Sequence, residues 1–521
     1  MIARPLPLAL IATVLALTAC DGPASPAGAS DGAGSGRDDR HPARWLDDSG
    51  LFQAGFGRVA FKARDGHTLT AMVYRSRSFD PASGPIWFTL HGANRDAERY
   101  VRAAAPVAER YGALAIAPAF TKQAYPKGTD YTFGVTAGGW GERTSLARAR
   151  WRDPGDTLYA EIEHLFEAAR RSLGGRQQGY YLFGHSAGAQ FTHRLLTFLP
   201  GARALGAVAA NAGWYTLPAD DDPRRHTVPY GLKGSPIRPE DLRGFFAMPF
   251  VVLLGERDTT TAETDELVRG DDEAEAQGST RLARGRFYFD LARSKAEAMH
   301  ADFGWRLAIV PRVGHDAAHM IESAGFFLFA PRESPCVASR AAEAAGLVIT
   351  EVLADPPPGA AGDANGDGKR DPSDDEFVEI VNAGKTPVCL SGWALGDASD
   401  PERHVFPLGR ALAPGGTLVV FGGGVPVGRF DGAEVQWATD GLGLSNDGDV
   451  ITLRDGADSI VRQLSWGDCG GSPCATDHWP GRLDIGGSLA RAPRPGSAWN
   501  AHSKVAGSPY SPGSAGGGAS R

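Results

Sequence analysis

The sequence has no excess of positive charge, which argues against a nucleic-acid-binding function. Its 53 lysines and arginines are outnumbered by 61 aspartates and glutamates, and the net charge is −8. Such a chain offers no basic field to attract phosphate backbones. With 42% hydrophobic and 22% charged residues the composition is that of a globular protein. The 521 residues are too many for one compact core, so we expect at least two domains.

Long apolar runs are also missing, except for one near the N-terminus. The run from Leu6 to Leu17 is too short to span a bilayer and is typical of a secretory signal. It ends in Leu17-Thr18-Ala19-Cys20, which resembles the lipobox of bacterial lipoproteins. We therefore expect a lipoprotein signal peptide over residues 1–19, a lipid on Cys20, and an exported protein anchored to the cell envelope, at a membrane or at the cell surface. The alternative is a plain signal peptide that happens to precede a cysteine.

Cysteine is scarce, and its spacing favours disulfides over zinc. Besides Cys20 there are four cysteines, an even number in an exported protein: Cys336, Cys389, Cys469 and Cys474. The short loop between Cys469 and Cys474 favours their pairing and leaves Cys336 for Cys389. A zinc site is the alternative, but the cysteines do not form two Cys-x-x-Cys pairs.

The first half of the chain has the pattern of an α/β domain. Residues 20–48 are rich in Gly, Ser, Ala and Asp and are predicted to form a flexible tether. Over residues 49–330, amphipathic stretches such as 96–111 and 157–173 alternate with buried-strand runs. These runs are Ile86 to Leu90, Ala113 to Ala117, Tyr180 to Phe183, Phe250 to Leu254 and Leu307 to Val310. Such alternation predicts a mostly parallel sheet with helices on both faces, which binds ligands at the carboxyl ends of its strands.

The second half has a different pattern. Residues 331–345 are predicted to be a linker, and residues 346–506 contain short β-type runs broken by Gly, Pro and Asp, with almost no helical period. This pattern predicts a small antiparallel sandwich. Residues 507–521 are predicted to be a disordered tail.

One motif carries the chemistry of a nucleophile. A strand ending at Phe183 leads into Gly184-His185-Ser186-Ala187-Gly188, and a helix-compatible segment follows. Gly-x-Ser-x-Gly between a strand and a helix is the context in which a sharp turn presents the serine hydroxyl above a sheet. We therefore predict Ser186 as the nucleophile, with the N–H of Ala187 as one oxyanion donor.

A serine nucleophile needs a base and an acid, and both follow later in the chain. Asp258 comes just after the strand run at 250–254, and His315 just after the run at 307–310. The order Ser, acid, His is that of α/β-hydrolases. Glu256 is the other candidate acid. Asp316, beside the histidine, is expected to be a surface or loop residue.

Together these motifs resemble α/β-hydrolases of the secreted polyhydroxybutyrate depolymerase and feruloyl esterase type. The segment Leu90-His91-Gly92-Ala93-Asn94 is where such enzymes present the second oxyanion N–H, and the resemblance assigns that role to Ala93. It implies an Asp258–His315–Ser186 triad that works through an acyl-enzyme and needs no catalytic cofactor. Trp214 and Tyr215 either line the acyl pocket or are core aromatics. Residues 125–140 and 223–244 are expected to form the loops over the site.

An acidic loop in the second half has the spacing of a calcium site. Oxygen-bearing side chains occupy its first, third, fifth, ninth and twelfth positions: Asp363, Asn365, Asp367, Asp371 and Asp374. Hard oxygen ligands at this spacing around a glycine suit Ca²⁺. The alternative is a solvated acidic insertion.

The runs after this loop resemble the lamin-tail domain, an immunoglobulin-like sandwich. They are Asp375 to Asn382, Leu390-Ser391-Gly392-Trp393, and Leu444 to Leu453. The resemblance implies binding to a surface or extracellular ligand rather than chemistry.

The sequence thus predicts an extracytoplasmic serine ester hydrolase that acts on a small or polymeric ester. Two alternatives stay open: a serine peptidase of the same fold, and a non-catalytic adhesion protein that acts through the lamin-tail-like domain.

Overall fold

The computed structural model describes most of the chain from residue 44 onward. The described residues are 44–64, 66–134, 136–137, 150–222, 226–330, 335–409, 411–438, 441–483, 486–494, 496–502 and 509–514. The signal peptide predicted at 1–19, the lipidation site Cys20, the tether up to residue 43 and most of the predicted tail lie outside them. No helix of the described part is both long enough and apolar enough to cross a membrane.

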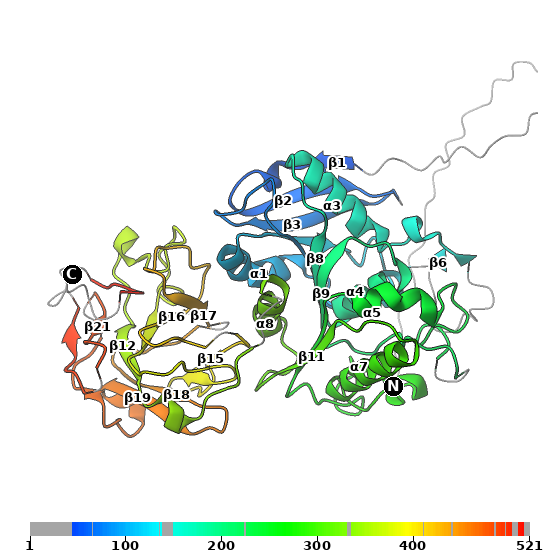
Figure 1. The fold of residues 1–521 in the computed structure, drawn as a ribbon. Coiled ribbons are helices and arrows are strands. Elements are labelled where there is room, and N and C mark those ends of the chain that lie inside the picture. Colours follow the sequence, from blue (N-terminus) through cyan, green and yellow to red (C-terminus); the bar gives the residue numbers. More distant parts are fainter. Residues whose placement is uncertain are drawn as a thin grey trace, which may run out of the picture. The chain divides into compact units, whose positions relative to one another are not determined.

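The first half folds around a nine-stranded sheet of order β1-β2-β3-β5-β4-β8-β9-β10-β11. The pairs from β5 to β11 are parallel, and β1, β2 and β3 extend the sheet antiparallel. The strands are β1 (Arg44–Asp47), β2 (Gly55–Lys62), β3 (Thr68–Arg75), β4 (Ile86–Leu90), β5 (Leu114–Ala119), β8 (Tyr180–His185), β9 (Ala204–Ala210), β10 (Phe250–Gly255) and β11 (Trp305–Val310). Figure 1 shows this sheet in the blue to green part of the chain. The predicted mostly parallel sheet is confirmed.

Helices cover both faces of the sheet. The longer ones are α1 (Ala97–Tyr111), α3 (Ala160–Ser172), α4 (Ala187–Phe198), α7 (Arg281–Ala298) and α8 (Ala317–Phe329). Short elements connect them: α2 (Gly128–Thr132), α5 (Arg243–Ala247), α6 (Asp272–Glu275), and the two-stranded ribbon of β6 (Thr136–Ala137) and β7 (Arg150–Trp151). Alternate side chains of β4 enter different cores. Phe88 belongs to the core that includes residues of α3, α4 and α7, whereas Trp87 belongs to the core that includes residues of α1 and α8. Burial on both faces explains why these strands are continuous apolar runs.

The second half is a two-sheet sandwich. One sheet has the order β17-β16-β13-β12-β21-β22 and the other β15-β14-β18-β19-β20. The strands are β12 (Leu347–Leu353), β13 (Phe377–Asn382), β14 (Ala394–Gly396), β15 (His404–Val405), β16 (Thr417–Phe421), β17 (Glu434–Trp437), β18 (Gly448–Arg454), β19 (Ile460–Gly467), β20 (His478–Trp479), β21 (Leu489–Ala490) and β22 (Asn500–Ala501). Residues of both sheets share one core, which includes the buried Trp466 of β19 and Trp393, the residue before β14. The predicted sandwich is confirmed, although β16–β17 and β19–β20 pair in parallel.

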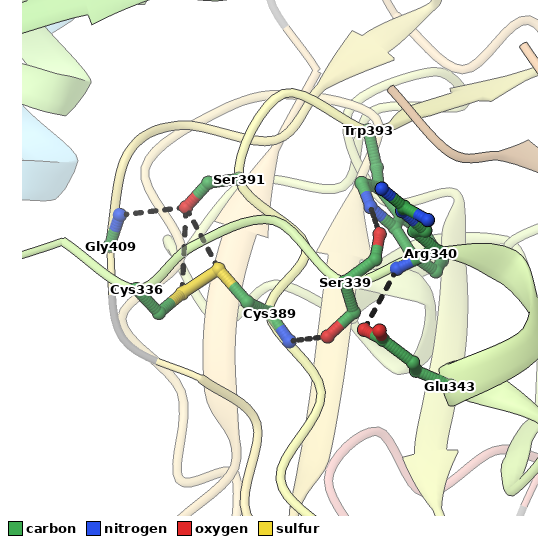
Figure 2. The surroundings of a disulfide bond; sticks show 8 residues. All are labelled: Cys336, Ser339, Arg340, Glu343, Cys389, Ser391, Trp393 and Gly409. Carbon is green, nitrogen blue, oxygen red and sulfur yellow. Dashed lines mark hydrogen bonds between the residues drawn. A yellow bond between two sulfur atoms is a disulfide. The ribbon is translucent and has the colours of Figure 1, made fainter. Parts of the chain in front are cut away.

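Two disulfides join the four cysteines in the predicted pairs, Cys336 with Cys389 and Cys469 with Cys474. Figure 2 shows the first, which ties the segment before β12 to the sandwich. The Ser391 hydroxyl lies 3.4 Å from Cys389 Sγ and accepts the N–H of Gly409. The Ser339 hydroxyl accepts the N–H of Cys389 at 3.1 Å. The Cys336–Cys389 disulfide therefore lies within a local network of hydrogen bonds rather than being an isolated crosslink.

A pair of buried glutamates makes the stability of the sandwich depend on pH. Glu351 and Glu379 face each other on β12 and β13, and neither is solvent-exposed. Burial, together with repulsion from Glu351, raises the pKa of Glu379 to about 7. An acid whose pKa is higher in the folded state binds its proton more tightly there. The stabilisation that protonated Glu379 supplies is therefore lost as pH rises from about 4.5, its ordinary pKa, to about 7, its pKa in the folded protein.

We expect Glu379→Gln to remove this dependence, because glutamine stays neutral. The free energy of unfolding of the wild type should fall relative to that of the variant between pH 5 and pH 8, by about 2 kcal/mol. Urea denaturation followed by tryptophan fluorescence at both pH values measures the difference. A constant difference between the two proteins would contradict the expectation.

Candidate active site

Ser186, the predicted nucleophile, lies in a sharp turn between β8 and α4. Ser186 has φ 57° and ψ −117°, a conformation that L-residues seldom adopt. Its backbone N–H donates to the carbonyl of Ala210 on β9 at 2.9 Å, which fixes the turn to the neighbouring strand. The serine is partly exposed, while the residues before it are buried. Strain of this kind is retained where it aims a reactive group, as the Gly-x-Ser-x-Gly motif predicts.

The two glycines of the motif allow the strand and helix to approach closely. A Cβ on Gly184 would lie 2.1 Å from the carbonyl oxygen of Gly188. A Cβ on Gly188 would lie 2.0 Å from the carbonyl oxygen of Leu90, on β4. Both contacts are with backbone atoms, which cannot move away without displacing β4 or α4.

We expect Gly188→Ala to destabilise the hydrolase domain by about 2 kcal/mol or more and to lower its activity, because the added methyl separates α4 from β4. Thermal unfolding and ester turnover measure the two effects. Gly201→Ala is the control, because a Cβ at Gly201 meets nothing within 4 Å. Equal unfolding temperatures for the two variants would contradict the expectation.

The predicted acid and base are hydrogen-bonded to each other. His315 Nδ1 lies 2.7 Å from Asp258 Oδ2. Asp258 is 1% exposed and the His315 side chain 28% exposed, so the acid is buried and the base faces the surface. The other oxygen of Asp258 accepts Arg281 Nη1 at 3.2 Å, and Arg281 is equally buried. The pair thus has the orientation in which an acid holds a catalytic histidine.

The other two acids near the histidine have structural roles. Glu256 Oε2 accepts the backbone N–H of Arg312 at 2.8 Å, so this residue fixes a loop. Asp316 is the N-cap of α8 and accepts the N–H of His319 at 3.0 Å. Its hydrogen bonds with His319 hold the pKa of Asp316 below the usual range in spite of burial. The geometry therefore favours Asp258 as the triad acid.

Asn211, which the sequence did not single out, joins the loops that carry the acid and the base. It follows β9 with a φ of 51°. Its side-chain amide donates to the carbonyl of Gly314 at 3.0 Å, and its Oδ1 accepts the N–H of Gly255 at 2.8 Å. Gly255 ends the strand before Asp258, and Gly314 precedes His315. The only signal in the sequence is that asparagine tolerates left-handed backbone at a strand end.

The loop after β4 passes beside Ser186. A Cβ on Gly92 would lie 3.7 Å from Ser186 Cβ. The Tyr100 hydroxyl would lie 3.1 Å from the same Cβ, so it packs against Gly92. Ala93 is exposed next to it, and Ala187 begins α4, where the first N–H groups have no acceptor inside the helix. Both predicted oxyanion donors thus lie in segments adjacent to Ser186.

His91 is a structural residue that shapes this loop. Its Nε2 accepts the N–H of Phe120 at 3.1 Å, and its carbonyl accepts the Tyr131 hydroxyl at 2.9 Å. Burial lowers the pKa of His91 to about 4, so the ring stays neutral and acts as an acceptor.

No hydrogen bond joins Ser186 to His315 in the described part of the chain. His185 is the residue before Ser186, and the centroid of its ring lies 4.5 Å from the centroid of the His315 ring. His315 therefore lies at the edge of the sheet where the Ser186 turn is. Catalytic hydrogen bonds of this kind are often long before substrate binds.

The two candidate pocket aromatics differ in surroundings. Tyr215 is fully buried and stacks on Tyr288 with centroids 4.3 Å apart, so it is a core residue. Trp214 is 5% exposed and carries the buried Arg194 guanidinium 4.0 Å above its ring. Of the predicted substrate loops, residues 135, 138–140 and 223–225 lie outside the described part.

The acidic loop is closed by a residue that the spacing did not indicate. Asp375 accepts the N–H of Asn365 at 3.0 Å and that of Asp371 at 2.6 Å. Gly368, at the sixth position of the loop, has a φ of 92°, as the sharp turn requires. Among the described residues, the one group of three His, Cys or carboxylate ligands found together is Cys469, Cys474 and His478, of which the cysteines are joined by a disulfide. The acidic side chains do not form such a group.

The fold and the site define a class. A mostly parallel sheet with a strained serine turn after β8, an acid after β10 and a hydrogen-bonded histidine after β11 is the arrangement of a serine hydrolase of the α/β fold. The family model described as Lamin Tail Domain matches residues 340–468. The chain therefore belongs to the α/β-hydrolases and carries a lamin-tail domain after the hydrolase domain.

Two solved structures are similar to the first half of the chain. One is a poly(3-hydroxybutyrate) depolymerase from Bordetella parapertussis, with 30% identity and a TM-score of 0.48, covering 54% of this chain and 93% of that chain. The other is poly(aspartic acid) hydrolase-1 from Sphingomonas sp. KT-1, with 30% identity and a TM-score of 0.47, covering 53% of this chain and 100% of that chain. None of the curated proteins compared with the sequence matches it.

Proposed function

We propose that the protein is a serine ester hydrolase that acts outside the cytoplasm on a small or polymeric ester. The observation that carries the proposal is the Asp258–His315 hydrogen bond at the sheet edge where the Ser186 turn lies. A buried carboxylate that orients a partly exposed histidine beside a strained serine suits acyl transfer. A purely adhesive protein would gain nothing from this strain.

The proposed mechanism assigns one role to each of these groups. His315 Nε2 takes the proton of Ser186 Oγ while Oγ attacks the ester carbonyl carbon. The N–H groups of Ala187 and Ala93 donate to the oxyanion that forms. When the carbon–oxygen bond to the alcohol breaks, His315 returns the proton to the alcohol. Water, deprotonated by His315, then attacks the acyl-enzyme, releases the acid and regenerates Ser186.

Ester and amide hydrolysis share this acyl-enzyme, so the leaving group has to be tested directly. We expect the purified protein to hydrolyse p-nitrophenyl esters of short acyl chains faster than the matching p-nitroanilides. Turnover of a series of esters from acetate to octanoate then shows which acyl-chain length the pocket prefers. Faster anilide turnover would favour the peptidase alternative, and no turnover of either series would overturn the esterase.

The N-terminal segment supports a proposal about location. Because an apolar run precedes Cys20, we propose that the protein is exported, lipidated at Cys20 and held at a membrane or the cell surface. The lamin-tail domain would then bind a surface or extracellular ligand. Incorporation of a labelled fatty acid by the wild type, and not by Cys20→Ser, supports the anchor. Equal labelling of both proteins would contradict it.

We also propose that the acidic loop binds a structural Ca²⁺, with catalysis independent of the ion. Asp363 Oδ1 is buried without a hydrogen-bond partner, as expected of an oxygen that serves as a ligand. Chelation with EGTA should lower the unfolding temperature of the sandwich, and added Ca²⁺ should restore it. The unfolding temperature of Asp363→Asn should change less than that of the wild type when EGTA or Ca²⁺ is added. If the unfolding temperature of the wild type did not change with Ca²⁺, the proposal would be contradicted.

A further inference from the structure

His185 is the last residue of β8, and folding alone does not explain its identity. It is 4% exposed, and its Nε2 is buried without a hydrogen-bond partner. A buried polar atom without a partner costs free energy that an apolar side chain of similar size would avoid. Such costs are retained mainly where the residue serves a function.

The ring of His185 packs against the ring of the base. The centroids of His185 and His315 are 4.5 Å apart, and the rings are inclined by 44°. Asp258 holds only the Nδ1 end of His315, and the His315 side chain is partly open to solvent. A buried neighbour against the ring limits the rotation that a single hydrogen bond leaves free. His185 immediately precedes Ser186 in the chain. Its contact with the His315 ring therefore fixes the position of that ring relative to Ser186.

The orientation of His185 is itself fixed. Its Nδ1 lies 3.1 Å from the Tyr100 hydroxyl. A neutral histidine that accepts a tyrosine hydroxyl at Nδ1 carries its ring proton on Nε2. A Cβ at Gly92 would lie 3.1 Å from this hydroxyl, so the glycine leaves it room. The chain of contacts runs from the oxyanion loop through Tyr100 and His185 to His315.

The charge of His185 suits a neighbour of a catalytic base. Burial, and next the adjacent His315, hold the pKa of His185 well below its ordinary value, with smaller contributions from Arg281 and Arg99 and an opposing one from Asp316. The ring is therefore neutral while His315 carries the proton taken from Ser186. A charged neighbour would repel the imidazolium that forms during the reaction.

We propose that His185 is a positioning residue: it holds the His315 ring toward Ser186 and, through Tyr100, couples that ring to the oxyanion loop at Gly92. The inference rests on the proposed serine-hydrolase function. It assigns His185 no proton transfer and no contact with substrate.

The test compares three single variants and one double variant of the whole protein with p-nitrophenyl butyrate as substrate. His185→Ala removes the ring and should lower kcat about 30-fold while KM changes less than about twofold, because a misplaced base slows chemistry rather than binding. His185→Phe restores the ring but not the bond to Tyr100, and should recover most of kcat. Tyr100→Phe removes the same hydrogen bond by deleting its other partner, the Tyr100 hydroxyl. The double variant His185→Phe with Tyr100→Phe should then be no slower than the slower single variant, as expected for two partners in one contact.

His164→Ala, on the outer helix α3, is the matched control and should keep full activity. Wild-type kcat in His185→Ala would overturn the inference. A loss of kcat that His185→Phe does not relieve, accompanied by an equal fall in unfolding temperature in both variants, would assign His185 a folding role and also overturn it. An active wild type with an inactive Ser186→Ala supports the proposed function independently. A wild type without ester or amide turnover would overturn the proposed function, and the inference with it.

Discussion

Ser186→Ala is expected to lower kcat for ester hydrolysis by about 10⁶-fold, to the residual rate that binding and the oxyanion donors supply. Alanine cannot form the acyl-enzyme, so no substituted intermediate accumulates. The hydroxyl of Ser186 makes no capping hydrogen bond to α4, and its removal should leave the unfolding temperature unchanged. Steady-state turnover of p-nitrophenyl butyrate and thermal unfolding measure the two effects.

The control for this variant is Ser279→Ala, at an exposed serine before α7. It should have wild-type kcat and the same unfolding temperature as Ser186→Ala. If Ser186→Ala kept more than about 1% of the wild-type kcat, the nucleophile would lie elsewhere, because removal of a nucleophile costs far more than this.

Asp258→Asn is expected to lower kcat by about 10⁴-fold with little change in KM. The asparagine keeps the shape of the side chain, but its amide group can turn an N–H toward His315 and then stabilise the tautomer that cannot accept a proton from Ser186. Arg281 would also lose one of its two charged partners, since the guanidinium contacts Asp258 Oδ1 at 3.2 Å and Asp265 Oδ2 at 3.1 Å. The pH-independent kcat of wild type and variant gives the ratio.

Glu256→Gln is the matched control for the acid. Glu256 lies two residues before Asp258, but its carboxylate accepts a backbone N–H of Arg312 and does not hold the histidine. This variant should therefore keep kcat within about threefold of the wild type, as expected for a change that leaves the triad intact. A loss as large as that of Asp258→Asn would show that the acid had been assigned to the wrong residue.

The features that the sequence predicted correctly are those with a local signal. Strands buried on both faces are continuous apolar runs, so β4, β8 and β10 could be located within one or two residues. The Ser186 turn was predictable because Gly184 and Gly188 are needed for the approach of backbone to backbone. Both disulfides followed from an even cysteine count and one short loop.

The features that the sequence did not reveal depend on contacts between distant segments. Arg281 reaches Asp258 from α7, and Asn211 joins the Gly255 and Gly314 loops from the end of β9. Nothing local distinguishes these residues from other arginines and asparagines. Asp375 closes the acidic loop although the calcium spacing assigns it no role. Its function depends on where two backbone N–H groups point, which spacing does not encode.

The central claim, that Ser186 is a nucleophile activated by His315 and Asp258, is tested most directly by reaction with a fluorophosphonate probe followed by peptide mass spectrometry. A single adduct is expected, on the peptide that contains Ser186. Its formation should be slowed by a competing p-nitrophenyl ester and be far slower in Asp258→Asn. An unlabelled Ser186, or equal labelling in wild type and Asp258→Asn, would contradict it.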